Sequence, residues 1–225
     1  MATTAVPFEL VEVKLNAPFT RARTVAKTDV IARLTAASAP FATVVAPAGY
    51  GKTTLLANWA VADPRRFAWV SLDGRDDDNA SVFLRYIAAA IHRVEPLAPE
   101  VFDALSGPAA SAWTTRVPRV GGALAALEGR LVLVLDDLHL IANPSCLDAL
   151  AGLVEYVPAG SQIAIASREE PELPLARWRA EGRVHEIGVA ELRLGEQECG
   201  LLLEGVGVEL DGSALRETES HLVTC

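Results

Sequence analysis

The segment at residues 43–56, TVVAPAGYGKTTLL, restricts the possible folds more than any other part of the sequence. A short β-branched run enters a turn with two glycines, and a helical pattern starts at Lys52. The turn has the spacing G-x-x-x-x-G-K-[ST], with Ala46 in place of the first glycine. Glycines let backbone N–H groups converge on phosphate oxygens, and the dipole of the following helix favours an anion. We therefore predict a strand, a phosphate-binding loop and a helix in direct succession.

The residues of this loop and of the first helical turn are the predicted nucleotide ligands: Ala48, Gly49, Tyr50, Gly51, Lys52, Thr53 and Thr54. Lys52 is long enough to reach the β- and γ-phosphates, and the hydroxyl of Thr53 is a ligand for Mg²⁺. Tyr50 either lies over the nucleotide or faces solvent. The alternative for the whole segment is a glycine-rich turn with an accidental Lys-Thr pair, which would hold no phosphate.

A second candidate group follows the most hydrophobic segment of the chain, LVLVLDDLH at 131–139. In P-loop ATPases an acid at the tip of such a strand holds Mg²⁺ through water, and we predict this role for Asp136. The next acid, Asp137, is the predicted catalytic residue that orients or deprotonates the attacking water. Because Asp is one methylene shorter than Glu, we expect slow hydrolysis. Considered without the glycine loop, two aspartates after a strand are more often a loop cap.

A cationic residue ends another apolar segment, IAIASR at 163–168. We predict that Arg168 is catalytic, as a donor to the charge that develops on the γ-phosphate. The alternative is a surface arginine that pairs with Glu169 and Glu170. His139 is also ambiguous, because it either hydrogen-bonds the acidic pair or is a buried structural residue.

Apolar runs and amphipathic patterns alternate along the chain. We expect strands at 41–47, 66–72, 131–136, 161–168 and 183–189, and helices at 29–37, 52–62, 80–94, 97–112, 116–129, 144–157 and 173–182. This alternation indicates a parallel sheet that is covered on both faces. The predicted fold class is therefore α/β, a P-loop NTPase three-layer αβα sandwich with a mostly parallel sheet.

The sequence suggests three parts: an N-terminal extension at 1–28, a P-loop NTPase domain at 29–190, and the start of a truncated helical subdomain at 191–225. The first part looks extended and irregular, whereas the last part turns all-helical, with helices expected from residues 195 and 211. The long gap between Lys52 and Asp136 leaves room for two intervening strands and their helices.

The chain carries 29 acidic and 20 basic side chains, a net charge of −9. Such a balance argues against DNA binding through bulk electrostatics. The three cysteines are far apart and form no Cys-x-x-Cys pair, which argues against a zinc site or a disulfide framework. The first residues lack the features of a signal peptide, and no apolar run approaches the ~20 residues needed to cross a bilayer. We expect a cytoplasmic protein without a membrane partner.

Four segments in order resemble the nucleotide-binding module of MalT-like, large LuxR-family transcriptional regulators, of the STAND class of AAA-like signalling ATPases. VVAPAGYGKTTLLANW (44–59) is similar to the Walker A segment of that family, including its alanine, and LVLDDLHLI (133–141) to its Walker B segment. WVSLDGRDDDNASVFLRYIAAAI (69–91) is similar to its second strand and following helix. ASREEPELPLARWRAEGRVHEI (166–187) is similar to its Ser-Arg sensor segment. The resemblance covers about residues 12–219.

This resemblance implies a switch that cycles between an ADP-bound closed state and an ATP-bound open state that self-associates. In that family a helical-repeat sensor binds the inducer, and a C-terminal helix-turn-helix binds promoters. The implied cofactors are ATP or ADP with Mg²⁺. The glycine loop, the acidic pair and Arg168 would take the roles given above.

The family-like pattern fades after RETE at 216–219, before any sensor repeats or helix-turn-helix. We therefore interpret the chain as a truncated or frameshifted product, or as a fragment of a split gene. The expected partners are a nucleotide and either a second copy or the missing regulator domains, without direct DNA binding. As an enzyme it would be at most a slow ATPase. The alternatives are an autonomous P-loop ATPase or kinase, and a non-functional fragment or protein-interaction remnant.

Overall fold

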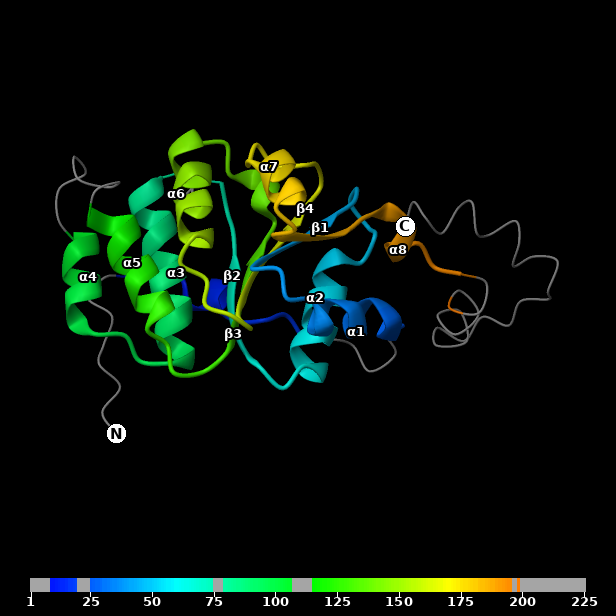
Figure 1. Ribbon diagram of the computed structural model, residues 1–225, viewed down its shortest axis with the longest axis horizontal. Helices are drawn as coiled ribbons and strands as arrows, with labels where there is room; N and C mark the ends of the chain where they lie inside the picture. The colour runs from blue at the N-terminus through cyan, green and yellow to red at the C-terminus, as the bar shows by residue number, and fades with distance from the viewer. Residues whose placement is uncertain (1–8, 20–24, 75–78, 107–114, 196–197, 199–225) are drawn as a thin grey trace.

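The computed structural model describes residues 9–19, 25–74, 79–106, 115–195 and 198. Within these residues, five parallel strands form one sheet in the order β2-β3-β4-β1-β5 (Figure 1). The strands are β1 (Phe41–Val45), β2 (Arg66–Ser71), β3 (Leu131–Asp136), β4 (Gln162–Ser167) and β5 (Val184–Ile187). Each lies within its predicted range, and the prediction of an α/β fold with a parallel sheet is confirmed.

Side chains along the strands alternate between two cores, one on each face of the sheet. In β3, Leu131, Leu133 and Leu135 belong to the first core, whereas Val132 and Val134 belong to the second. Strand β4 repeats the pattern, with isoleucines toward the first core and alanines toward the second. Because both faces are buried, successive positions must be apolar, which explains the continuous apolar runs in the sequence.

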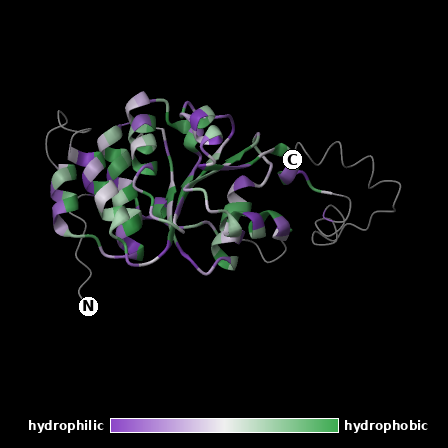
Figure 2. Cartoon of the chain, in the orientation of Figure 1, coloured by the Kyte–Doolittle hydropathy of each residue, from purple (hydrophilic) through white to green (hydrophobic). Residues whose placement is uncertain are grey.

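Helices cover both faces of this sheet. The first core is covered by α3 (Ala80–Val94), α4 (Pro99–Ser106), α5 (Val117–Ala125) and α6 (Pro144–Val154), and the second by α1 (Thr28–Ala36) and α2 (Lys52–Ala62). The two groups lie on opposite sides of the strands (Figure 1), and along them apolar and hydrophilic bands alternate (Figure 2). The predicted three-layer αβα arrangement is thus confirmed. No helix of the described residues is long and apolar enough to cross a membrane.

Two short helices, α7 (Leu175–Ala180) and α8 (Val189–Leu192), contact β5. The helices that we expected from residues 195 and 211 fall almost entirely outside the described residues, as does the end of the one expected at 97–112. The proposed division of the chain into three parts remains a prediction.

The described part of the N-terminal segment is more ordered than we expected. Residues Glu12–Leu15 form a 3₁₀ helix, and Leu15 is buried in the first core. Lys14 is buried as well, with its ammonium group 4.7 Å from the centre of the Tyr86 ring. The expectation of an irregular segment was wrong here because four residues are too few to show a periodic pattern.

The strand order brings three loops together at one edge of the sheet. Among the described residues only β2 lies between α2 and β3 in the sequence, and not two strands as we expected. Strand β4 is inserted between β1 and β3. Because all three strands are parallel, the segments that follow them meet at their carboxyl ends, where α/β proteins bind ligands.

The orientation of α2 is fixed at its far end by Trp59, which is fully buried. Its Nε1 donates to Thr35 Oγ1 at 3.1 Å and to Asp63 Oδ2 at 2.9 Å. Asp63 also accepts from Arg65 Nη2 at 2.6 Å. These contacts tie the end of α2 to α1, so the opposite end of α2 is held rigidly against the loop from β1.

The glycine pair in α5 provides a test of the packing of α5 against the residues that follow α6. A Cβ atom at Gly121 would collide with the ring of Tyr156, whereas one at Gly122 would have nothing within 4 Å. We expect Gly121→Ala to lower the free energy of unfolding by about 1–3 kcal/mol through overpacking. The matched variant Gly122→Ala should raise it by about 0.5–1 kcal/mol, because alanine favours a helix. Urea denaturation measures both, and equal stability of the two variants would contradict the packing.

Candidate functional site

The loop between β1 and α2 starts as a continuation of the sheet. The Ala46 N–H donates to the carbonyl oxygen of Ser167 at 3.2 Å, and Ala46 is fully buried. Ala46, which stands in place of the first glycine of the motif, therefore lies at the end of the strand. Gly49 and Gly51 have φ angles of 84° and 73°, in the left-handed region that favours glycine. Gly51 is the N-cap of α2, so no side chain caps the first amides of that helix.

Lys52 begins α2 and folds back over the loop. Its Nζ donates to the carbonyl oxygens of Ala46 at 2.7 Å and Pro47 at 2.8 Å. Burial lowers the pKa of the Lys52 amine, Asp137 and Asp136 oppose this effect, and Arg168 adds to it. The amine therefore lies within electrostatic reach of the other predicted site residues.

A hydrogen bond joins the loop to the acidic pair. Thr53 Oγ1 donates to Asp136 Oδ1 at 3.0 Å, across 83 positions of sequence. Asp136 is only 3% exposed, and its Oδ1 also accepts from the N–H of Asp137 at 3.1 Å. Burial raises the pKa of the Asp136 carboxyl to about 6; the bond from Thr53 opposes this, and the charge of Asp137 adds to it. Because Thr53 gives its proton to Asp136, its oxygen lone pairs stay available to a cation.

Asp137 and His139 lie next to each other after β3. Asp137 has a φ of 61°, the only positive φ of a non-glycine residue in the described chain, and its side chain is 45% exposed. His139 Nδ1 lies 3.8 Å from Asp137 Oδ1, which is too long for a hydrogen bond. Neither ring nitrogen of His139 has a hydrogen-bond partner among the described residues, and burial lowers its pKa. Of the two roles considered for His139, the structure therefore favours the buried residue.

Arg168 directly follows β4, between the strands that end in the other two motifs. It is exposed and forms no ion pair within the described residues, while Glu170 pairs with Arg179 at 2.6 Å. The local pairing that we considered for Arg168 is therefore not observed. The buried Ser167 fixes the turn that contains Arg168, because its Oγ donates to the carbonyl oxygen of Glu169 at 2.6 Å. Ser167 had no predicted role of its own, although a lone hydroxyl at the end of an apolar run was a usable signal.

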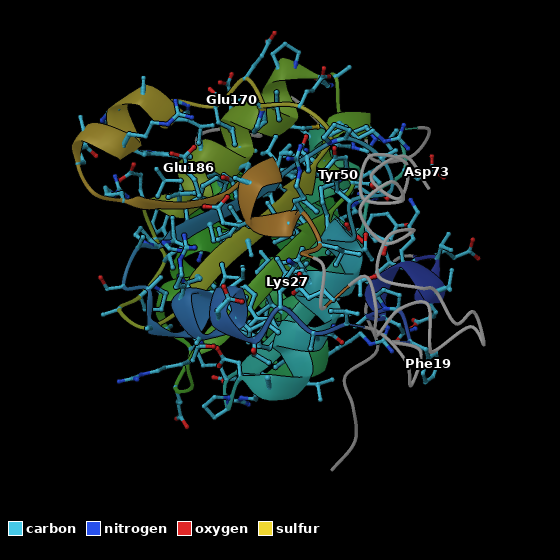
Figure 3. The ribbon with its side chains drawn as sticks, turned by 90° about the vertical axis from the view of Figure 1, so that its right-hand side faces the viewer. Phe19, Lys27, Tyr50, Asp73, Glu170 and Glu186 are labelled. Atoms are coloured by element: carbon cyan, nitrogen blue, oxygen red, sulfur yellow. The ribbon has the colours of Figure 1, made fainter. Side chains whose placement is uncertain are left out.

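The remaining predicted ligands lie on the same loop and helical turn. Ala48 is exposed and Thr54 is half-buried. Tyr50, labelled in Figure 3, is half-buried and packs against the second core, so its ring does not simply face solvent. A contact between Tyr50 and a nucleotide remains a prediction.

The residues present fit a nucleotide with Mg²⁺. The uncapped N-terminus of α2 and the left-handed glycines form the kind of backbone cradle that takes a phosphate. Thr53 and Asp136 offer oxygen ligands, which Mg²⁺ prefers. The described residues contain no group of three or more His, Cys, Asp or Glu that would hold a metal alone. A Mg²⁺ ion here would therefore depend on phosphate oxygens and water for its other ligands.

Comparisons with known proteins identify relatives by sequence and a similar fold among solved structures. No protein-family model matches the chain. It is 32% identical over 202 residues to the HTH-type transcriptional regulator MalT of Cronobacter sakazakii, covering 84% of this chain and 21% of that protein. Against MalT of Yersinia pestis it is 32% identical over 197 residues, covering 87% of this chain and 22% of that protein.

Among solved structures, a similar one is that of a STAND protein with a tetratricopeptide repeat sensor from Pyrococcus horikoshii. The TM-score is 0.62 at 13% identity, covering 93% of this chain and 30% of that one. At this identity the likeness shows the fold alone, and it agrees with the α/β arrangement of the described residues.

The sequence identity to the two MalT proteins indicates homology, in addition to the likeness in fold. The chain is homologous to the HTH-type transcriptional regulator MalT, as the resemblance had indicated. It spans about a fifth of the length of these relatives. The homology therefore concerns one segment of these regulators and not their whole length.

The buried Asp136 carboxylate leads to a pH-dependent prediction. Its pKa is about 6 in the folded state, against an ordinary value of 3.8, so the folded state binds more protons than the unfolded state between these values. Stability therefore falls as pH rises through this window, and the whole penalty is present above it. In the absence of nucleotide and metal, Asp136→Asn should raise the free energy of unfolding near neutral pH by up to about 3 kcal/mol.

The gain should shrink toward about pH 4, where the wild-type carboxyl is protonated in the folded state. Urea denaturation of both proteins across this range provides the measurement. A variant that is less stable than the wild type near neutral pH would contradict the burial of an uncompensated charge at Asp136.

Proposed function

We propose that this chain is an ATP-binding switch module of a MalT-like transcriptional regulator, with slow hydrolysis at most. The observation that carries the proposal is the bond between Thr53 and Asp136. This bond joins the predicted phosphate-binding loop to the predicted metal-binding acid. Neither motif alone distinguishes a nucleotide site from an ordinary turn. The homology to MalT supports the regulatory part of the proposal.

The loop and helix would bind the phosphates. The amides at the start of α2 would donate to them, and Lys52 would exchange its two loop carbonyls for the β- and γ-phosphate oxygens. The side chain of Thr53 would hold Mg²⁺ directly and that of Asp136 through water. A bound Mg²⁺ would neutralise charge on the phosphates.

Asp137 and Arg168 would act on the γ-phosphate. Asp137 is the more exposed aspartate of the pair and would orient or deprotonate the attacking water. Arg168 lacks a competing acidic partner in the described residues, so its guanidinium is available to the charge that develops in hydrolysis. A residue that touches only the γ-phosphate would also let the module distinguish ATP from ADP.

In a regulator, this distinction would control the contacts of the module. We propose that ATP favours an open state that associates with a second copy or with other regulator domains, and that ADP favours a closed one. The MalT relatives are named as helix-turn-helix regulators, but their match to this chain covers about a fifth of their length. Direct promoter binding is therefore not proposed for these residues.

Lys52→Ala is the first test of the nucleotide site. The substitution removes a charged donor, which is worth about 1.5–3 kcal/mol, so we expect affinity for Mg-ATP and Mg-ADP to fall by about 10- to 100-fold. Isothermal titration calorimetry measures this with the purified chain. Val61→Ala, on an exposed position of the same helix, is the matched control and should bind like the wild type.

Absence of nucleotide binding by the folded wild type would contradict the proposal and favour a non-functional or interaction fragment. Steady turnover above about 1 s⁻¹ would instead favour an autonomous ATPase or kinase, because this is the low end of ordinary enzyme rates.

Arg168→Ala tests the proposed γ-phosphate contact. Removal of one donor to developing charge should lower the hydrolysis rate by about 100-fold or more, whereas affinity for Mg-ADP should stay within about twofold. Single-turnover hydrolysis and calorimetry with both nucleotides give these quantities. The matched control is Arg177→Ala, because Arg177 is an exposed arginine of α7 whose pairing with Glu181 contributes little. Equal losses for ATP and ADP would argue against a γ-phosphate contact.

A further inference from the structure

Ser71 ends the strand next to the acidic pair, and the function proposed above gives it no role. It is the last residue of β2 and lies directly opposite Asp136 in the register of β2 with β3. Neighbouring strands are about 4.8 Å apart, so the two residues are immediate neighbours at the edge where the loops meet. Ser71 is half-buried, which leaves it accessible from the site.

The side chains of Ser71 and Asp136 project from the same face of the sheet. In β2, Ala68 and Val70 belong to the first core and Trp69 to the second, so the alternation places Ser71 on the second face. The indole of Trp69 confirms this, because its Nε1 donates to Ser71 Oγ at 3.0 Å. In β3 the valines of the second core precede Asp136 with the same alternation. This is the face covered by α2, which carries Thr53.

The two side chains present free acceptor sites to the space between them. Trp69 occupies one lone pair of Ser71 Oγ and leaves a second one. Both hydrogen bonds to the Asp136 carboxylate fall on Oδ1, so Oδ2 accepts none within the described residues. No direct hydrogen bond joins Ser71 to Asp136 there, and two acceptors one strand apart are suited to a bridging water, which donates two protons.

We infer that Ser71 is a positioning residue for the metal: Ser71 Oγ and Asp136 Oδ2 accept the two protons of one water in the hydration shell of Mg²⁺. This inference rests on the proposed function, because it requires Mg²⁺ to bind beside Thr53 and Asp136. Mg²⁺ keeps several of its waters in protein sites, so residues that hold those waters contribute to its affinity. Trp69, a donor only, fixes the serine oxygen in place as an acceptor.

The experiment measures how much Mg²⁺ strengthens ADP binding, as the ratio of the dissociation constants in EDTA and in Mg²⁺, by calorimetry. Ser71→Ala should reduce this ratio by about 10-fold, the lower end for loss of an outer ligand, and leave the affinity in EDTA unchanged. Ser71→Thr keeps the hydroxyl and should restore the ratio. An unchanged ratio in Ser71→Ala would overturn the inference.

A second pair of variants separates this role from a purely structural one, in which Ser71 only satisfies the buried indole of Trp69. Trp69→Phe removes that indole donor and should keep the ratio of the wild type. Ser71→Ala in the Trp69→Phe background should again reduce the ratio of the dissociation constants. A normal ratio in the double variant would show that Ser71 serves only the indole and would overturn the inference.

Failure of the proposed function gives a different result. In that case the wild type itself would bind ADP no better with Mg²⁺ than in EDTA, and Asp136→Asn would change nothing. If the wild type and Asp136→Asn differ as expected but the Ser71 variants do not, only the inference about Ser71 is wrong. Thermal unfolding of each variant confirms that the chain is folded.

Discussion

The hydrogen bond from Thr53 to Asp136 is the contact on which the site depends. It forms because β4 is inserted between β1 and β3, which sets the distance between the loop and the acid, and because α2 starts at the tip of β1. The far end of α2 is held by the buried indole of Trp59. A shift of α2 along its axis would separate Thr53 from the carboxylate, so the packing of the second core and the geometry of the site are linked.

The site also concentrates features that reduce stability. Asp136 is a nearly buried carboxylate whose ionisation is disfavoured by its surroundings, and Asp137 has a left-handed backbone. His139 has two buried nitrogens without a hydrogen-bond partner among the described residues. Elsewhere in the described core, buried polar side chains such as Asp63 and Gln162 are hydrogen-bonded. Several destabilising features at one edge of the sheet are typical of a functional site, because a bound ligand can offset their free-energy cost.

Most of the fold could be predicted from the sequence because the central strands β1, β3 and β4 are buried on both faces. That constraint makes the strands apolar at successive positions, and the five predicted ranges all contain the observed strands. The errors have local causes. The 3₁₀ helix at Glu12–Leu15 is too short to show a period, and the number of strands between α2 and β3 could not be read from the length of the gap.

The sequence by itself determined the chemistry of the site: a glycine loop that allows left-handed backbone, a lysine, a hydroxyl, and acids at the end of an apolar strand. These are properties of residue type and spacing, and they can be identified in the amino-acid sequence without knowledge of the fold. Only the tertiary structure decided which of these groups meet, because strand order depends on how the helices pack and not on any one segment. It places Ser71 opposite Asp136, leaves Arg168 without a local acidic partner, and buries His139 beside Asp137. Proximity of this kind is set by long-range packing, which a single sequence does not specify.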